Sequence, residues 1–94
     1  MFTISRKENG TVELEGRLDA SQVETASSIL DAVTGSCIID FARLDYISSA
    51  GLGVLLKTQK RLGASGQSLK LINMNKMIRD VFRIARFDLI FPIE

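Results

Sequence analysis

Two adjacent serines, Ser48 and Ser49, are the side chains whose type and position could do chemistry in this sequence. They follow a polar link after a short apolar run, and they come just before a stretch with helical spacing. A serine at a helix N-terminus can cap the helix with its hydroxyl. It can also accept a phosphoryl group, because the terminus stabilises an added anion by roughly 0.3–1 kcal/mol. Capping is the simpler interpretation, and both serines fit it.

Two glycines in the first turns of the same expected helix, Gly51 and Gly53, point beyond capping. Each costs about 1 kcal/mol relative to alanine inside a helix. They either permit close packing of the helix or leave its backbone bare, so that another protein can approach the serine hydroxyl. Phosphorylation would then add a charge of roughly −1.5 to −2 that a docked partner does not tolerate. The segment therefore predicts a switch in protein binding that leaves the fold intact.

The composition argues against most other chemistry. The chain has 94 residues, no histidine and one cysteine, and its 12 basic and 11 acidic residues give a net charge of +1. Because histidine is the commonest general base and metal ligand, we expect neither an enzyme nor a metal site. Cys37 lies in an apolar run and is expected to be a buried, inert thiol. The small net charge argues against nucleic acid as a partner.

The N-terminus and the apolar runs indicate where the protein acts. Charged residues begin at Arg6, before an apolar signal core could form, and no apolar run approaches the length of a membrane span. We expect a cytoplasmic protein that does not enter the membrane. Hydrophobic residues make up 46% of the chain and charged residues 24%, so residues 1–94 are expected to form one folded domain.

Five segments of the sequence have strand-like patterns. Residues 2–5 and 11–18 alternate apolar and polar side chains on either side of an Asn-Gly turn, which predicts a β-hairpin. Short apolar runs predict further strands at residues 37–41 and 68–73. Residues 89–93 include a proline, which confines them to a short last strand or an extended segment at an edge.

Three segments have helical spacing. The first helix is expected to start near Ser21, with Asp19 or Ser21 as its cap, and to stop before Gly35. The second begins near Ser49 and ends at Gly63 or Gly66, and the third spans residues 77–85. Strands that alternate with helices after a hairpin predict a single α/β domain, with a mainly parallel sheet and helices predominantly on one face. The core is expected to include Val23, Leu30, Ile38, Leu52, Leu55, Leu71, Val81 and Phe82.

The order of these elements and one motif resemble a known family. Residues 46–56, which read Tyr-Ile-Ser-Ser-Ala-Gly-Leu-Gly-Val-Leu-Leu, and the Gly-Arg-Leu-Asp end of the second strand resemble the STAS domains of bacterial anti-sigma factor antagonists. The likeness covers essentially the whole chain. The family's motif reads aspartate, serine, serine or threonine, glycine, leucine, and its first serine accepts phosphate. Placing Gly51 and Leu52 on the family's glycine-leucine pair makes Ser49 the acceptor.

Two positions depart from the family's motif. Ser48 stands where the family has aspartate, and Ala50 stands where it has a second hydroxyl. Loss of the carboxylate removes a negative charge beside the acceptor, so kinase docking or the rate of phosphorylation is expected to differ. The acceptor itself, Ser49, is retained.

The resemblance also implies partners and a mechanism. The unphosphorylated protein binds a cognate anti-sigma factor, which is also an ATP-dependent serine kinase, and thereby frees the sigma factor. Phosphorylation of Ser49 ends this binding, and a serine phosphatase restores it. The nucleotide belongs to the kinase, so this chain is expected to need no cofactor. It is expected to be a monomer or a weak dimer, and a dimer through the opening hairpin stays open.

The resemblance places the partner-binding surface around the acceptor. It comprises Asp19, Ser48, Ser49, Ala50, Gly51, Leu52 and Gly53. Asp19 has a second interpretation, as the N-terminal cap of the first helix. Asp40, at the end of the strand at residues 37–41, is expected at the same edge of the sheet. The alternative function is that of a STAS subunit in a larger signalling or lipid-transport assembly, without a phosphorylation cycle.

Overall fold

Four strands form one sheet in the order β1–β2–β3–β4, in a computed structural model that describes residues 1–94. The strands are β1 (Phe2–Arg6), β2 (Val12–Leu18), β3 (Cys37–Ile47) and β4 (Leu69–Ile72). β1 pairs antiparallel with β2, and the pairs β2–β3 and β3–β4 are parallel. Gly10 has φ +89° in the turn between β1 and β2, a conformation that glycine adopts without strain. The predicted hairpin and the mainly parallel sheet are confirmed.

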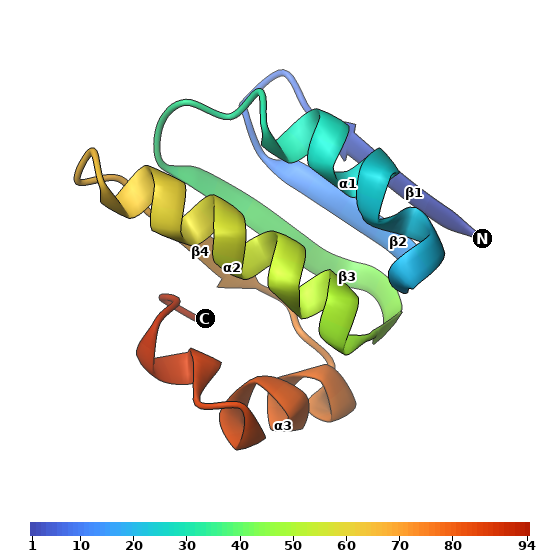
Figure 1. The fold of residues 1–94 in the computed structure, drawn as a ribbon. Coiled ribbons are helices and arrows are strands. Elements are labelled where there is room, and N and C mark those ends of the chain that lie inside the picture. Colours follow the sequence, from blue (N-terminus) through green and yellow to red (C-terminus); the bar gives the residue numbers. More distant parts are fainter.

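The helices lie between and after the strands and cover one face of the sheet (Figure 1). They are the short 3₁₀ helix η1 (Ala20–Gln22), α1 (Val23–Leu30), α2 (Ser49–Gly63), α3 (Lys76–Ile84) and the 3₁₀ helix η2 (Phe87–Leu89). α1 and α2 lie side by side in front of the sheet, and α3 lies beyond them, on the side of β4. The predicted arrangement of helices predominantly on one face is confirmed.

Alternating burial along the strands follows from this one-sided cover. In β3, Cys37, Ile39 and Phe41 are buried against the helices, whereas Ile38 points to the uncovered face and is 37% exposed. The prediction of Ile38 as a core residue is therefore wrong. An apolar run is typical of a strand covered on both faces, but only one face is covered here.

The other predicted core residues lie on the helix side of the sheet. Leu30, Leu52, Leu55, Leu71 and Phe82 are buried, and Val23 and Val81 pack against this core while remaining partly exposed. Cys37 is 8% exposed, so the expectation of a buried thiol is confirmed.

β3 is much longer than the predicted strand at residues 37–41. It continues to Ile47 and includes the residues that the sequence suggested as a polar link. Its register against β2 shifts twice, between Glu13 and Glu15 and between Gly16 and Arg17. At each shift β3 contributes an extra residue, as in a β-bulge, and the alternation of side chains is interrupted.

The C-terminal segment lies along the outer edge of β4. Ile93 forms a single parallel bridge with Leu71, whose N–H donates to the carbonyl oxygen of Pro92 at 2.8 Å. Phe87–Leu89 form a 3₁₀ turn, so the predicted last strand is reduced to an extended edge segment. No helix of the chain combines the length and the apolar character needed to cross a membrane.

An aromatic cluster fixes α3 and the C-terminal segment to the sheet. The ring of Phe82, on α3, packs edge-on against Phe41 of β3 at a centroid distance of 6.0 Å. It also contacts Phe87 at 6.0 Å and Phe91 at 5.8 Å. Because Phe82 is fully buried, it connects α3 both to β3, which is distant in the sequence, and to the C-terminal segment that follows α3.

We expect Phe82→Ala to lower the free energy of unfolding by about 3–5 kcal/mol, since it removes this buried ring and leaves a cavity. Urea unfolding followed by circular dichroism measures the loss. The control is Leu89→Ala, whose side chain is 77% exposed and should change stability by no more than about 0.5 kcal/mol. Equal effects of the two substitutions would contradict the packing described here.

Candidate functional site

The N-terminus of α2 lies at the end of β3 and begins directly after Ser48. Ser48 is the N-cap, because its Oγ accepts a hydrogen bond from the N–H of Gly51 at 3.2 Å. Its carbonyl oxygen accepts from the N–H of Leu52 at 2.9 Å, which closes the first helical turn. Ser49 is the first residue of the helix and is exposed. One serine therefore caps the helix and the other presents its hydroxyl to solvent.

The helix terminus has donors available for an anion beside that hydroxyl. The N–H of Ser48 is already used by the carbonyl oxygen of Leu18, at 2.9 Å, and that of Gly51 by the cap. The N–H groups of Ser49 and Ala50 have no carbonyl four residues earlier within the helix. The first turn of α2 contains no acidic residue. The local field therefore favours a negative group at Ser49.

The two glycines of the segment have different roles. A Cβ on Gly51 would lie 2.8 Å from Leu18 Cγ, 2.9 Å from Ile47 Cγ1 and 3.0 Å from the carbonyl oxygen of Leu18. Close packing against β2 and β3 therefore requires glycine at this position. Gly53 is exposed, and a Cβ there would meet no atom within 4 Å. It lies one helical turn after Ser49 on the same face, so the backbone beside the hydroxyl is bare.

Asp19 follows β2 and caps η1. Its Oδ1 accepts hydrogen bonds from the N–H of Ser21 at 3.0 Å and from the hydroxyl of Ser21 at 2.6 Å. These two bonds hold the pKa of the Asp19 carboxyl below its ordinary value of 3.8, and the bond from the hydroxyl has the larger effect. Asp19 is a cap, but of η1 rather than of α1 as predicted, because α1 starts later and has Gln22 at its N-cap without a side-chain bond. The contact of Asp19 with a partner stays a prediction. Since η1 packs against α2, Asp19 belongs to the same end of the sheet as Ser49.

Asp40 does not lie at this edge, contrary to the prediction. β3 continues beyond it as far as Ile47, so Asp40 is an interior strand residue level with Ile72, at the end of β4. Its carboxylate accepts from the N–H of Ala42 at 2.9 Å and from the side-chain amide of Asn73 at 3.1 Å. These bonds support the first bulge of β3 and give Asp40 a structural role.

Two features near the site were not predicted from the sequence. Asn75 caps α3 through the N–H of Ile78, and its side-chain amide also donates to the carbonyl oxygen of Leu44 at 3.3 Å. Asparagine just before a helical pattern was the available signal. The guanidinium of Arg17 lies 4.3 Å from the ring centre of Tyr46, on the uncovered face of the sheet. These contacts stiffen the strand ends that precede the site.

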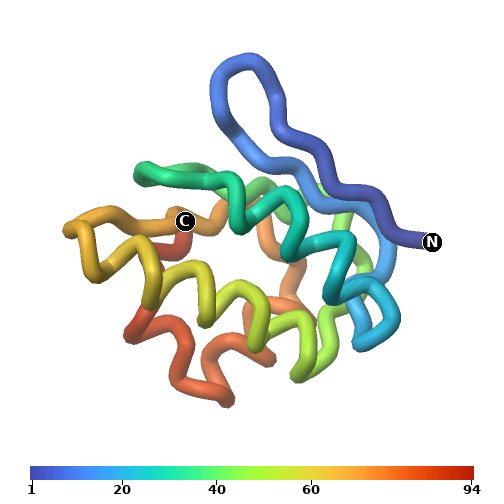
Figure 2. The backbone as a smooth tube through the Cα atoms, turned by 45° about the horizontal axis from the view of Figure 1, so that its top comes forward, coloured from blue at the N-terminus to red at the C-terminus, as the bar shows by residue number.

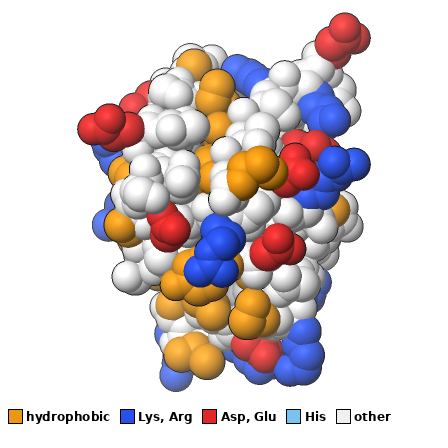
Figure 3. Space-filling model, turned by 90° about the vertical axis from the view of Figure 1, so that its right-hand side faces the viewer, with side chains coloured by type: hydrophobic (Ala, Val, Ile, Leu, Met, Phe, Trp, Pro, Cys, Tyr) orange, Lys and Arg blue, Asp and Glu red, His pale blue; other side chains and the backbone are white.

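The surface at this end of the molecule is mixed in character. Figure 3 faces the side where α2 begins, and it shows basic and acidic side chains interspersed, with hydrophobic side chains gathered in the lower part, toward α3. Met77, in the first turn of α3, is 57% exposed. Charges of both signs on this face differ from the one-sided basic patch that marks a nucleic-acid surface.

Comparison of the sequence with protein families and curated proteins gives consistent matches. The family model described as "Mlab, STAS domain" matches residues 2–92. A protein of Bordetella bronchiseptica named "Putative anti-sigma factor antagonist BtrV" is 36% identical over 84 residues, which cover 85% of this chain and 72% of that protein. A STAS-domain containing protein of Pseudomonas aeruginosa is 23% identical over 87 residues, which cover 89% of this chain and 86% of that protein.

Solved structures with the same fold include one protein in two states. The chain is similar to the anti-sigma factor antagonist SpoIIAA in its unphosphorylated form, with 25% identity, a TM-score of 0.71 and coverage of 100% of this chain and 87% of that one. The phosphorylated form of SpoIIAA from Bacillus gives 25% identity, a TM-score of 0.71 and coverage of 100% and 91%. An anti-sigma factor antagonist from Mycobacterium paratuberculosis, at 18% identity, shares the fold with a TM-score of 0.82 and coverage of 99% and 83%.

The contrast between the two glycines gives a matched pair of substitutions. We expect Gly51→Ala to destabilise the protein by about 1–3 kcal/mol, because the added methyl group overlaps Leu18 and Ile47. Gly53→Ala should instead stabilise it by up to about 1 kcal/mol, because the site is open and alanine favours the helix. Thermal or urea unfolding of both variants measures the difference. The assignment of Gly51 as the packing glycine fails if the two variants are equally stable.

The lowered pKa of Asp19 predicts a pH dependence of stability. A carboxyl whose pKa is lower in the folded state stabilises the fold above its unfolded pKa, and this contribution is lost as the pH falls through the folded pKa. Wild-type protein should therefore lose stability relative to Asp19→Asn as the pH falls below about 4. Ser21→Ala removes the hydrogen bond from the Ser21 hydroxyl, which is the larger cause of the lowered pKa, so the pKa of Asp19 should move toward 3.8. Carboxyl titration by NMR measures the pKa of Asp19 in wild type and in Ser21→Ala. An unchanged pKa in Ser21→Ala would show that the Ser21 hydroxyl is not the cause of the lowering.

Proposed function

Because the chain belongs to the STAS domain family, we propose that it is an anti-sigma factor antagonist whose binding is switched by phosphorylation of Ser49. The observation that supports this most directly is that the two adjacent serines have different structural roles. Ser48 Oγ is engaged as the cap of α2, whereas Ser49 is exposed on the first residue of the helix. A kinase can therefore reach the Ser49 hydroxyl without breaking the helix cap.

The unphosphorylated chain binds an anti-sigma factor that is also an ATP-dependent serine kinase, and so releases a sigma factor in the cytoplasm. The contact surface comprises Asp19 and the first turn of α2, from Ser48 to Gly53. The bare backbone at Gly53 lets the partner approach closely, and the partly exposed Ala50 lies in the same turn. Leu52 is buried in the core and supports this surface from below. This chain supplies the hydroxyl and no cofactor, because the nucleotide belongs to the kinase. A serine phosphatase resets the cycle.

Phosphate acts on the partner rather than on the fold. It adds a charge of roughly −1.5 to −2 at a helix terminus that stabilises anions, with the N–H groups of Ser49 and Ala50 already directed there. The same charge and bulk block a partner that docks on the first turn of α2. This chain matches the unphosphorylated and the phosphorylated form of SpoIIAA with the same TM-score of 0.71, so both states of that protein share the fold described here.

One alternative is favoured by a specific departure from the family's motif. Ser48 replaces an aspartate and Ala50 replaces a second hydroxyl, so the acceptor lacks two of its usual neighbours. The alternative is a STAS subunit of a larger signalling or lipid-transport assembly that binds through the same surface without phosphorylation. Substitutions at Ser49 separate the two functions, because only the switch depends on the charge at that position.

Ser49 should be the single residue modified when the protein is incubated with its cognate kinase and ATP and then mapped by mass spectrometry. Ser49→Ala should stay unmodified and bind the kinase as tightly as unphosphorylated wild type. Ser49→Asp should weaken binding by about tenfold or more, or about 1.4 kcal/mol, because it introduces part of the phosphate charge. Calorimetry measures the affinities.

Ser48→Asn is the matched control, because asparagine keeps the helix cap but lacks the hydroxyl. It should still be phosphorylated on Ser49. Amide spectra of Ser49→Asp should differ from wild type only around the start of α2. Modification of Ser49→Ala at the wild-type rate would refute the acceptor assignment. Equal affinities of Ser49→Asp and Ser49→Ala would favour the subunit without phosphorylation.

A further inference from the structure

The outer edge of β1 is the edge of the sheet that no other segment of the chain covers. In Figure 2 the dark blue tube of β1 runs along the outside of the molecule. β1 pairs only with β2. β4, at the other edge, has the C-terminal segment beside it, where Leu71 bonds to Pro92 and Glu94 through its N–H and its carbonyl oxygen. The sheet therefore ends in an open strand on the β1 side.

Alternate residues of β1 leave their backbone groups free at this edge. Just beyond the strand, the N–H of Lys7 donates to the carbonyl oxygen of Thr11 at 2.8 Å, so the odd-numbered residues face β2. The even-numbered residues point their N–H and carbonyl groups away from β2, and they are Phe2, Ile4 and Arg6. These groups form no hydrogen bond within the chain. They are available to another strand.

β1 lacks the features that usually protect an open edge from pairing. It contains no proline, its register against β2 is unbroken, and its one charge lies at its last residue, Arg6. Phe2 and Ile4 pack against the core on the helix side of the sheet, and α1 leaves both of them partly exposed. A strand beside β1 would therefore gain backbone hydrogen bonds and cover more of these two side chains.

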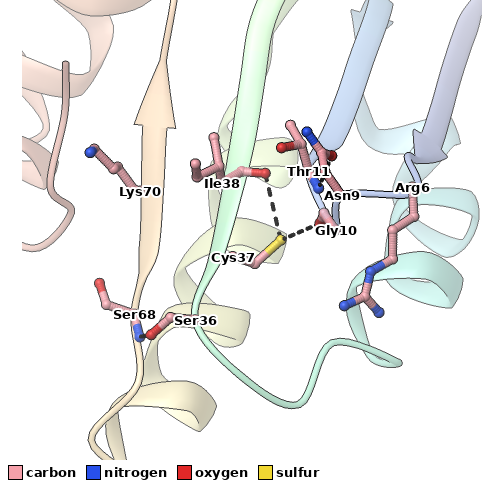
Figure 4. A pocket seen from close by; sticks show the side chains of 9 residues that line it. All are labelled: Arg6, Asn9, Gly10, Thr11, Ser36, Cys37, Ile38, Ser68 and Lys70. Carbon is pink, nitrogen blue, oxygen red and sulfur yellow. Dashed lines mark hydrogen bonds between the residues drawn. The ribbon is translucent and has the colours of Figure 1, made fainter.

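Contacts at the hairpin turn hold β1 in position. A pocket of about 440 Å³ lies under this turn, between it and the segments around Ser36 and Ser68 (Figure 4). In its wall the thiol of Cys37 donates to the carbonyl oxygen of Gly10 at 3.3 Å, which ties the hairpin to the start of β3. The open edge is thus formed before another strand binds, and pairing costs less conformational entropy.

This edge is complementary to itself. When two copies of β1 lie antiparallel with Ile4 opposite Ile4 of the second copy, Phe2 of each copy lies opposite Arg6 of the other. Each outward N–H and carbonyl group then meets a partner, as in the closely spaced pairs of an antiparallel ladder. Side chains directly opposite each other share a face. Isoleucine therefore contacts isoleucine, and the guanidinium of Arg6 lies over the ring of Phe2, a favourable cation–π pair.

The charges on β1 do not oppose this pairing. The two Arg6 side chains would lie four residues apart along the strands, about 14 Å. This separation exceeds the screening length of about 8 Å at physiological salt. Thr3 and Ser5, on the other face of β1, are uncharged. Because each copy contributes one short strand, the interface falls below about 1,200 Å², which is typical of weak complexes.

We propose that the open edge of β1 binds a second copy of this chain, in an antiparallel pair centred on Ile4 that joins the two sheets into one. The occupant is a copy of the same strand because β1 offers its own complement in register, side chains and charge. Ser49 takes no part in the pair, so the dimer does not depend on the function proposed above.

Sedimentation equilibrium and amide hydrogen exchange of the wild-type chain test the dimer without any substitution. The chain should associate with a dissociation constant of about 1 mM or tighter, as expected for a weak interface. As the concentration rises, the amides of Ile4 and Arg6 should exchange more slowly, whereas those of Thr3 and Ser5, which already face β2, should change little. A monomer at every concentration, or a dimer in which Ile4 and Arg6 stay unprotected, would overturn the proposal.

A pair of charge variants tests the register. Ile4→Lys and Ile4→Glu should each weaken the homodimer about tenfold or more, because like charges then lie directly opposite each other. An equimolar mixture of the two should form a heterodimer tighter than either homodimer. Circular dichroism checks that both variants fold, and the exchange measurement on wild type decides the matter if one does not.

Ile84→Lys is the matched control, because it places the same charge on α3, at a side chain that is 80% exposed. It should dimerise as wild type does. If Ile84→Lys abolished the dimer and Ile4→Lys did not, the interface would lie on α3 and the pairing of β1 would be refuted. Failure of the mixture of Ile4→Lys and Ile4→Glu to associate more tightly than the single variants would refute the register centred on Ile4.

Discussion

The contact between the start of α2 and the end of β2 is the constraint on which the candidate site depends. Gly51 lies so close to Leu18 that a methyl group would overlap both its side chain and its carbonyl oxygen. That same carbonyl oxygen accepts the N–H of Ser48 at 2.9 Å. The strand end and the helix start are thus joined by one hydrogen bond and one close approach. Since Ser49 follows Ser48 directly, its direction out of the fold is fixed by this contact rather than by interactions of its own.

Sequence patterns predicted the elements whose signals are local. Asn9 and Gly10 predicted the hairpin, because a glycine with positive φ suits that turn. Helical spacing after Ser48 predicted a helix that begins near Ser49, because a cap and an apolar stripe coincide there, and the first residue of α2 is Ser49. The proposal of Ser49 as the acceptor needed only this local register together with the family's motif. For these features, nearest neighbours in the chain determine the structure.

Features that depend on distant neighbours could not be predicted. The two bulges interrupt the alternation in β3, so residues up to Ile47 did not resemble a strand, and Asp40 was placed at the wrong edge. Ile38 is exposed because the helices leave one face uncovered, which an apolar run does not reveal. Gly51 and Gly53 have the same propensity, and only the positions of Leu18 and Ile47 distinguish them. The pocket joins segments around residues 10, 36 and 68, whose proximity exists only in the folded chain.

The departure at Ser48 separates two roles that an aspartate would combine. A carboxylate and a hydroxyl oxygen both cap a helix, and Ser48 Oγ accepts the N–H of Gly51 here. The cap is therefore kept, and with it the geometry that exposes Ser49. The charge is not kept, so a phosphate on Ser49 would meet the helix dipole without a neighbouring anion in the first turn. In the proposed switch, less repulsion would favour the phosphorylated state of the isolated chain, while the kinase would lose one acidic contact. Serine at position 48 would therefore shift the equilibrium between the phosphorylated and unphosphorylated states in the proposed switch, while the helix cap that positions Ser49 is kept.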